Sequence, residues 1–202
     1  MVGLPVFRAP VRLVVLISGN GSNLQAIIKQ IDCGALSAEI VAVISNKSDA
    51  YGLKRAAKNN IPVCTLSHRD FESREQYDEA LKILIDKYQP DLIILAGFMR
   101  ILSNAFVEHY SHKMMNIHPS LLPKYKGLNT HQRAIDAGEK IHGCSVHFVT
   151  PELDDGPVIL QASVDIKADD TADTLASRVH EQEHIIYPKA IQLFAEHKIK
   201  LV

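Results

Sequence analysis

The sequence is poor in residues that cross-link a chain or anchor it in a membrane. It has no tryptophan and only three cysteines, Cys33, Cys64 and Cys144, without a Cys-x-x-Cys pair. An odd number of widely spaced cysteines argues against a disulfide framework and favours a reducing compartment. No apolar run reaches the roughly 18 residues of a membrane-spanning helix, and the opening MVGLPVFRAP lacks the regions of a secretion signal. We therefore expect a cytoplasmic protein that does not bind membranes.

An excess of charge of one sign is also lacking. Lys and Arg total 22 and Asp and Glu total 23, so the formal net charge of -1 gives no general attraction to nucleic acid. His142 and His147 flank a predicted strand, but no His-Glu-x-x-His motif or Cys/His cluster is present, so we expect no metal. The Gly-x-Ser-x-Gly turn of serine hydrolases is missing too. What remains is ordinary globular composition, 47% hydrophobic and 22% charged, at a length that suits one domain.

Strand and helix patterns alternate along the first half of the chain. The run Val11–Ile17, rich in β-branched residues, is typical of a strand buried on both faces. The spacing predicts further strands at residues 40–44, 63–66 and 91–96, and helices at residues 23–31, 51–58 and 74–87. Such alternation is typical of a parallel sheet whose strands all end at one edge, where ligands bind.

The second half of the chain is less regular. It predicts strands at residues 114–117, 144–149 and 158–164, a helix at residues 130–137, and a long helical segment from about Thr171. Pro188 should kink or restart that last helix. No linker is visible, so we predict one domain over residues 1–202, with residues 1–10 as an N-terminal arm. The predicted fold class is α/β: a Rossmann-like, mostly parallel, twisted sheet with helices on both faces.

The segment between the first strand and the first helix, residues 18–23, has the sequence SGNGSN. Small residues let a ligand approach the backbone, and free N–H groups at a helix start favour an anion such as a phosphate group. The dinucleotide fingerprint is incomplete, because Leu24 replaces its third glycine and the second strand ends in Asn46 and Lys47. The alternative is a tight turn in which Ser22 caps the helix.

Polar side chains in the second half suggest acyl-transfer chemistry. Asn116 and His118 are predicted to share one face of a strand, because side chains alternate along it. An amide donor beside an imidazole suits a reaction in which a carbonyl oxygen gains charge and a proton moves; a buried structural pair is the alternative. Asp154, in the turn of residues 152–157, would orient an imidazole and favour its charged form, or would bond its own backbone in a solvated turn.

Four segments together resemble one known family, phosphoribosylglycinamide formyltransferase, the folate-dependent enzyme of purine biosynthesis. They are VVLISGNGSNLQAII, LAGFMRIL, NIHPSLLPKYKGLNTH and HGCSVHFVTPELDDGPVILQ, and the resemblance runs from about Val11 to about Phe194. It implies the formyltransferase fold and transfer of a formyl group from the co-substrate 10-formyltetrahydrofolate to the glycinamide amine of a phosphoribosyl substrate. We expect small-molecule substrates, no metal, and a monomer or weak homodimer.

The resemblance also implies a role for each matching residue. Asn116, His118 and Asp154 match the catalytic triad, with His118 as general acid, Asn116 hydrogen-bonded to the oxygen of the tetrahedral intermediate, and Asp154 keeping His118 cationic. The residues that match the phosphoribosylglycinamide site are Gly21, Ser22, Asn23, Glu183 and His180, the last at a position where family members differ. The residues that match the formyl-folate site are Arg74, Met99, Arg100, Ile101, Leu102, Asn116, Thr150, Pro151, Glu152, Leu153 and Asp154.

Three alternatives to this function stay open. Formyltetrahydrofolate deformylase passes the formyl group to water, but it usually carries an N-terminal regulatory domain, for which the residues before Val11 leave no room. Methionyl-tRNA formyltransferase adds a C-terminal tRNA-binding domain, which neither the end at Val202 nor the charge balance favours. A non-catalytic folate or nucleotide sensor is disfavoured because Asn116, His118 and Asp154 are all present.

Overall fold

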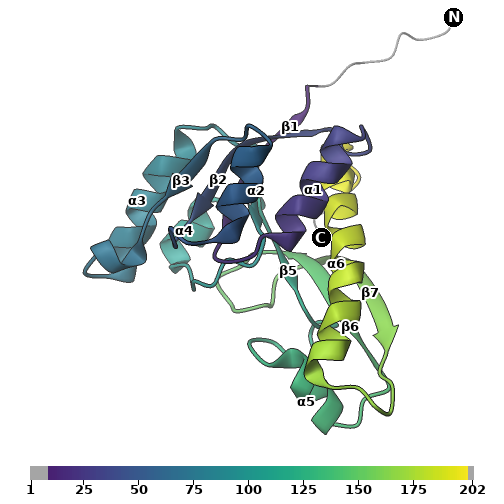
Figure 1. Ribbon diagram of the computed structural model, residues 1–202. Helices are drawn as coiled ribbons and strands as arrows, with labels where there is room; N and C mark the ends of the chain where they lie inside the picture. The colour runs from purple at the N-terminus through teal and green to yellow at the C-terminus, as the bar shows by residue number, and fades with distance from the viewer. Residues whose placement is uncertain (1–8, 200–202) are drawn as a thin grey trace, which may run out of the picture.

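A seven-stranded sheet forms the centre of the protein, whose computed structural model describes residues 9–199 (Figure 1). The predicted arm, residues 1–10, thus lies almost wholly outside the described residues. The strands, in the spatial order β3-β2-β1-β4-β5-β6-β7, are β1 (Val11–Ile17), β2 (Ala38–Ser45), β3 (Val63–Thr65), β4 (Leu92–Leu95), β5 (Met114–His118), β6 (Ile141–Phe148) and β7 (Val158–Asp165). β1 to β5 pair in parallel, whereas β6 and β7 pair antiparallel. The predicted α/β class with a mostly parallel sheet is confirmed.

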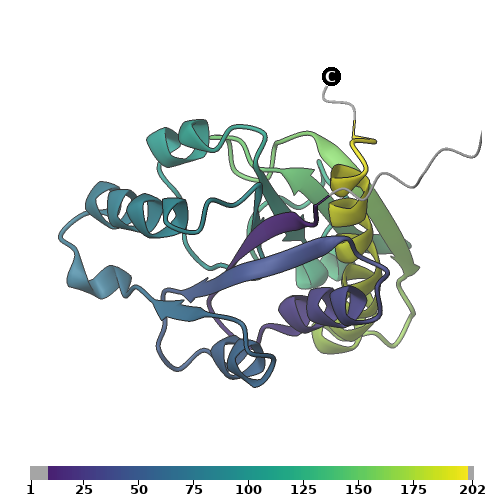
Figure 2. The ribbon, with the colours of Figure 1, turned by 90° about the horizontal axis from the view of Figure 1, so that it is seen from above.

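Helices cover both faces of this sheet (Figure 2). The helices are α1 (Ser22–Asp32), α2 (Tyr51–Lys58), α3 (Arg74–Asp86), α4 (Asn104–His109), α5 (Thr130–Asp136) and α6 (Ala172–Ala195). α1, α2 and α6 pack on one face, and α3 and α4 pack on the other. No helix in residues 9–199 is both long and apolar enough to cross a membrane.

The continuous apolar run of β1 follows from this two-sided packing. Leu13, Val15 and Ile17 belong to the core under α1 and α6, whereas Val14 and Leu16 belong to the core under α3 and α4. All five side chains are fully buried. A strand covered on both faces has no solvent-facing position, so it shows no alternation of apolar and polar residues.

The structure corrects the expectation that the last helix restarts at Pro188. α6 runs without interruption from Ala172 to Ala195, with Pro188 buried inside it. Proline lacks only one N–H, and apolar residues on both sides of it, such as Val179 and Ile191, are fully buried against the sheet. This packing keeps the helix continuous despite the missing hydrogen bond.

The structure also contains a helix that was not predicted and a strand that begins three residues earlier than expected. α4, a helix of six residues whose first turn is capped by the Ser103 hydroxyl, was not predicted. It is too short to show a helical period of apolar residues. β6 begins at Ile141 rather than at Cys144, because its pairing with β7 extends from His147 to Ile141.

Tyr187 of α6 ties the helix to the sheet beside the strand ends. Its fully buried hydroxyl lies 3.0 Å from the carbonyl oxygen of Leu95 and 2.9 Å from that of Met115. Tyr187→Phe should lower the free energy of unfolding by about 1 to 3 kcal/mol, because it removes the donor that these carbonyls share. Urea denaturation measures the change.

A matched control exists in Tyr77, whose buried hydroxyl has no hydrogen-bond partner in the part of the chain that the structure describes. Tyr77→Phe should leave the free energy of unfolding unchanged or raise it, because no hydrogen bond is lost. Equal destabilisation by the two substitutions would contradict the assignment of a stabilising bond to Tyr187.

The register of the strands brings three strand ends to one level. Leu16 of β1 pairs with Leu95, the last residue of β4, and Leu95 pairs with Asn116 of β5. β1 is also the strand at which the strand order reverses, since β2 lies on one side of it and β4 on the other. Open α/β sheets bind their ligands at such a switch point, outside the carboxyl ends of the strands. The loops after β1, β4 and β5 are therefore where a site is expected.

Candidate active site

His118 and Asp154, which are distant in the sequence, form a buried pair at this edge. Nδ1 of His118 lies 3.3 Å from Oδ2 of Asp154, and their side chains are 7% and 9% exposed. The same Oδ2 accepts a hydrogen bond of 2.9 Å from the backbone N–H of Gly127. Asp154 has φ 51°, in the left-handed region, which Asp and Asn adopt more readily than most residues. The backbone of the β6–β7 loop therefore favours Asp or Asn at position 154, and Asp supplies the carboxylate that contacts His118.

Both ring nitrogens of His118 lie beside an oxygen acceptor. Nε2 lies 2.9 Å from the backbone oxygen of Tyr125, and because a carbonyl oxygen can only accept, Nε2 is the donor. Nδ1 faces the Asp154 carboxylate, which is a second acceptor. Each ring nitrogen of His118 therefore faces an oxygen that can accept a hydrogen bond, the backbone oxygen of Tyr125 at Nε2 and the Asp154 carboxylate at Nδ1.

Asn116 lies beside this pair and contacts a second histidine, His147. Asn116 and His147 are directly opposite each other in the β5–β6 register, and Nδ2 of Asn116 lies 3.2 Å from Nε2 of His147. Nδ1 of His147 donates to the backbone oxygen of Phe148 at 2.8 Å. Burial lowers the pKa of His147, so it is neutral near pH 7 and its Nε2 accepts from Asn116. This bond fixes which way the Asn116 amide points, and its second N–H has no partner among residues 9–199.

Sequence reasoning considered His147 only as a metal ligand and missed its place in the site. Its Nε2 also lies 3.8 Å from Oδ1 of Asp154, so it touches two of the three predicted catalytic residues. The signal that finds it is the antiparallel register of β5 and β6, which the spacing along either strand alone does not contain.

The loop of residues 18–23, which we call the phosphate loop, ends in a helix start without a side-chain cap. Gly21 is the N-cap residue of α1, with φ 73°, and no side chain caps the helix. The alternative in which Ser22 caps the helix is therefore wrong, because Ser22 is the first residue of the helix itself. A helix start without a capping side chain presents its first N–H groups to an anion.

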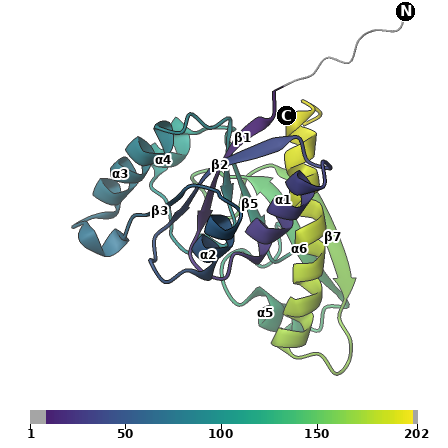
Figure 3. The same ribbon diagram turned by 45° about the horizontal axis from the view of Figure 1, so that its top comes forward.

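Asn23 and Glu183, both predicted to bind substrate, are brought together between α1 and α6, which lie side by side (Figure 3). The Asn23 amide donates to Oε2 of Glu183 at 2.8 Å, and both residues are buried. Burial raises the pKa of the Glu183 carboxyl. Oδ1 of Asn23 is buried and has no partner within the described residues. His180 lies one turn earlier on α6 and is exposed.

Ser18 connects the phosphate loop to the loop after β4. Its hydroxyl donates to Oδ1 of Asn46 at 2.6 Å and accepts from the backbone N–H of Met99 at 2.8 Å. Its own N–H donates to the backbone oxygen of Gly97 at 3.1 Å. The start of the segment predicted to bind folate is therefore fixed against the end of β1.

The residues predicted to bind formyl-folate divide into exposed and buried side chains. Met99, Ile101 and Leu153 are large apolar side chains that are 66%, 64% and 58% exposed, and exposed apolar side chains in loops beside a site are typical of a ligand-binding surface. Leu102 is buried, Arg100 and Thr150 are half-buried, and Pro151 and Glu152 are exposed. Arg74 differs, since it starts α3 and pairs with its neighbour Glu75. None of its described contacts reaches the other candidates.

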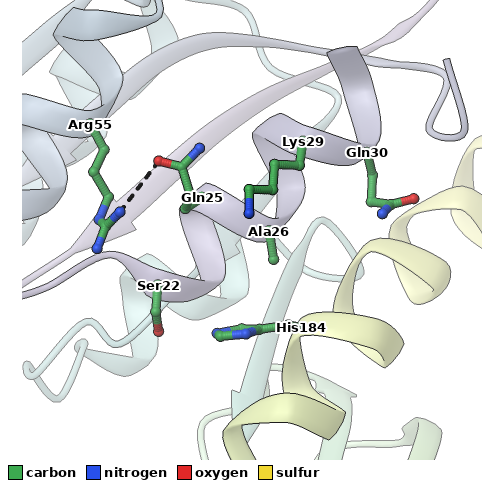
Figure 4. Close-up of a pocket in the computed structure, with 7 residues that line it drawn as sticks. All are labelled: Ser22, Gln25, Ala26, Lys29, Gln30, Arg55 and His184. Atoms are coloured by element: carbon green, nitrogen blue, oxygen red, sulfur yellow. Dashed lines mark hydrogen bonds between the residues drawn. The ribbon is translucent and has the colours of Figure 1, made fainter. Parts of the chain in front are cut away.

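A pocket of about 320 Å³ lies near the phosphate loop, between α1, α2 and α6 (Figure 4). It is lined by Ser22, Gln25, Ala26, Lys29, Gln30, Arg55 and His184. Three of these side chains are basic and none is acidic, but the pocket contains none of Asn116, His118 and Asp154. The described residues include no group of three or more His, Cys, Asp or Glu that could hold a metal ion.

Comparison with known proteins gives a consistent result. The family described as formyl transferase matches residues 11–191. Phosphoribosylglycinamide formyltransferase of Escherichia coli (strain K12) is 56% identical over 189 residues, which cover 94% of this chain and 89% of that protein. The human trifunctional purine biosynthetic protein adenosine-3 is 45% identical over 190 residues, which cover 94% of this chain and 19% of that protein.

Solved structures of similar proteins show the same fold. Phosphoribosylglycinamide formyltransferase from Coxiella burnetii is 57% identical, with a TM-score of 0.92 over 96% of this chain and 90% of that chain. Glycinamide ribonucleotide transformylase 1 from Symbiobacterium toebii is 40% identical, with a TM-score of 0.95 over 99% of this chain and 94% of that chain.

Proposed function

This chain belongs to the formyl transferase family and, within it, to the phosphoribosylglycinamide formyltransferases, and we propose that Asn116, His118 and Asp154 carry its reaction. In this reaction the formyl group passes from 10-formyltetrahydrofolate to the amine of phosphoribosylglycinamide, in purine biosynthesis. The observation that carries the proposal is the contact of His118 with Asp154 at 3.3 Å, with Asn116 two residues away on the same strand face.

The reaction needs a donor for a developing negative charge and a source of a proton. When the amine attacks the formyl carbon, the carbonyl oxygen of the formyl group gains negative charge in the tetrahedral intermediate. The free N–H of Asn116 donates to this oxygen, because its other N–H is bonded to His147. As the bond between the formyl carbon and the folate nitrogen breaks, the amine loses a proton and the folate nitrogen gains one.

His118 supplies the proton for the intermediate, and the lengths of its two polar contacts indicate which one. Nε2–H is bonded to Tyr125 at 2.9 Å, a normal hydrogen-bond length, whereas the 3.3 Å contact between Nδ1 and Asp154 is longer than usual. We assign the transferred proton to Nδ1, where a substrate oxygen replaces or shares the Asp154 contact. The proton passes from Nδ1 to the oxygen of the intermediate and returns to Nδ1 when the carbonyl group forms again. The nearby carboxylate of Asp154 favours the cationic ring before transfer, and Tyr125 holds the neutral tautomer afterwards.

The two substrates occupy neighbouring loops in this proposal. The phosphate group of phosphoribosylglycinamide binds at Gly21, Ser22 and Asn23, with His180 beside it, because the start of α1 has no capping side chain. Glu183 and the unpartnered Oδ1 of Asn23 offer acceptors to hydroxyl or amide groups of the same substrate. The formyl-folate occupies the loops of residues 99–102 and 150–154, in which Met99, Ile101 and Leu153 expose apolar side chains.

A two-substrate assay tests the activity itself. Purified protein is mixed with 10-formyltetrahydrofolate, with and without phosphoribosylglycinamide, and folate deformylation is followed. Turnover that requires the ribonucleotide and yields formylated product is the expected result. Turnover without it, with release of formate, would indicate a deformylase, in which water takes the place of the amine.

Asp154→Asn should lower kcat by about 10- to 100-fold, the equivalent of a lost charge-assisted hydrogen bond of about 1.5 to 3 kcal/mol. Asparagine tolerates the left-handed backbone at this position, so the loop is expected to keep its shape while the carboxylate charge is lost. Steady-state kinetics with both substrates saturating measures the change.

Asp155→Asn provides the matched control for this loop. Asp155 is the adjacent carboxylate, it is exposed, and it pairs with Lys126 rather than with His118. Its substitution should leave kcat near the wild-type value, because exposed ion pairs contribute little. Similar losses in both variants would mean that the loop, and not the Asp154 charge, determines turnover.

A further inference from the structure

Arg55 of α2 bonds to the phosphate loop from outside the residues assigned to substrate. Its Nε donates to the backbone oxygen of Asn20 at 2.9 Å, and its Nη2 donates to Oδ1 of Asn20 at 2.9 Å. Its Nη1 donates to Oε1 of Gln25 on α1 at 3.4 Å, as Figure 4 shows. One guanidinium group therefore connects the middle of the loop with the first turn of α1.

The guanidinium is itself held in place by an aromatic ring. Its central carbon lies 4.8 Å from the centre of the Tyr51 ring, also on α2. A planar guanidinium stacked on a ring keeps its N–H groups in one fixed fork, which a lysine ammonium cannot reproduce. Asn20 is therefore bound by a group whose own orientation is restricted.

The backbones of the loop and α2 are also in close contact. The N–H of Gly52 donates to the backbone oxygen of Gly19 at 3.0 Å. A Cβ atom added to Gly21 would lie 2.7 Å from the Cα of Gly52, and one added to Gly52 would lie 2.5 Å from Cδ1 of Ile17. Only glycine fits both positions without displacing these atoms. The close contact with the start of α2 therefore restricts the backbone conformation of the loop.

We propose that Arg55 is a positioning residue that holds the phosphate loop in the conformation presenting the first N–H groups of α1 to the substrate phosphate. The inference rests on the proposed function of this loop. Arg55 acts through Asn20 and Gln25. Their oxygens accept hydrogen bonds from the guanidinium N–H groups that face the loop. It contributes to binding of the ribonucleotide, and it has no part in proton transfer at His118.

The test compares Arg55→Lys with the wild type on two acceptors, phosphoribosylglycinamide and the glycinamide riboside that lacks the phosphate. With the ribonucleotide, KM should rise about tenfold, the equivalent of about 1.4 kcal/mol of lost binding. The value of kcat and the KM for 10-formyltetrahydrofolate should stay within about twofold of wild type. With the riboside, the two proteins should have the same kcat/KM, because no phosphate is there to be positioned.

Two further variants make the result specific. Lys54→Ala is the matched control: the Lys54 amine also lies over the Tyr51 ring, at 6.0 Å from its centre, but makes no described bond to the loop. It should behave as wild type. Asn20→Ala removes the side-chain partner of Arg55, so its effect on KM and that of Arg55→Lys should be non-additive in the double variant.

Each outcome decides the proposal. A wild-type KM in Arg55→Lys would overturn it, and so would equal losses with ribonucleotide and riboside, which indicate general damage. Additive effects of Asn20→Ala and Arg55→Lys would overturn it in favour of direct contact between Arg55 and phosphate. If the wild type itself does not prefer the ribonucleotide to the riboside, the proposed function of the phosphate loop fails and the role of Arg55 fails with it.

Discussion

Replacing His118 by alanine is expected to lower kcat by about 10²- to 10⁴-fold, the usual contribution of a positioned general acid. The alanine variant has no group that can deliver a proton to the oxygen of the tetrahedral intermediate. The KM for the ribonucleotide should change little, because the phosphate loop belongs to a different strand end. Steady-state kinetics gives kcat, and calorimetry gives ribonucleotide binding by the same protein sample.

The alanine variant also leaves the buried Asp154 carboxylate without its contact with the His118 ring, which destabilises the local structure. His118→Asn therefore serves as a second variant, since it keeps a hydrogen-bonding side chain but cannot act as an acid near pH 7. If both variants bind the ribonucleotide and both lose turnover, the loss belongs to proton transfer. Near-normal kcat in either variant would eliminate His118 as the acid.

Asn116→Ala is expected to lower kcat by about 10²- to 10³-fold, which is the typical effect of removing one donor to a developing oxyanion. The substitution removes the N–H that we assign to the reacting oxygen, and it leaves Nε2 of His147 without its donor. The loss should appear in kcat, with the KM of each substrate changed much less, because the bond strengthens only as charge develops.

Asn104→Ala controls for the loss of an exposed asparagine elsewhere. Asn104 is exposed at the start of α4, so its substitution should leave kcat unchanged. A kcat for Asn116→Ala within about threefold of this control would contradict the oxyanion role, given the larger effects seen when such donors are removed. A large rise in KM alone would assign Asn116 to substrate binding instead.

The fold was predictable where the determining interactions are local. The buried run Val11–Ile17 and the apolar spacing of α1 reflect the faces that these elements bury, and both appear as expected. Prediction failed where contacts between residues far apart in the sequence determine the structure. α6 passes through Pro188 because residues far from it in the sequence hold both of its halves, and no local rule about proline contains that information.

The candidate site likewise has a part that the sequence predicts and a part that it does not. Alternation along a strand places Asn116 and His118 on one face without knowledge of the fold. The 3.3 Å contact of His118 with Asp154 depends on a long loop and on the left-handed backbone at Asp154, so spacing alone left it open and only the family resemblance indicated it. The position of His147 in the site follows from its strand register with Asn116. Neither the spacing of residues nor the family resemblance provided this register.

The two tasks proposed for the site lie on different kinds of secondary structure element. Groups assigned to the acceptor, at Gly21 to Asn23 and Glu183, lie on α1 and α6, whereas those assigned to bond making and breaking lie on β5 and the β6–β7 loop. Altered acceptor specificity and altered chemistry therefore require mutations in different segments. An engineer who wishes to formylate a different amine should vary the acceptor segments and leave residues 116–118 and 150–154 untouched.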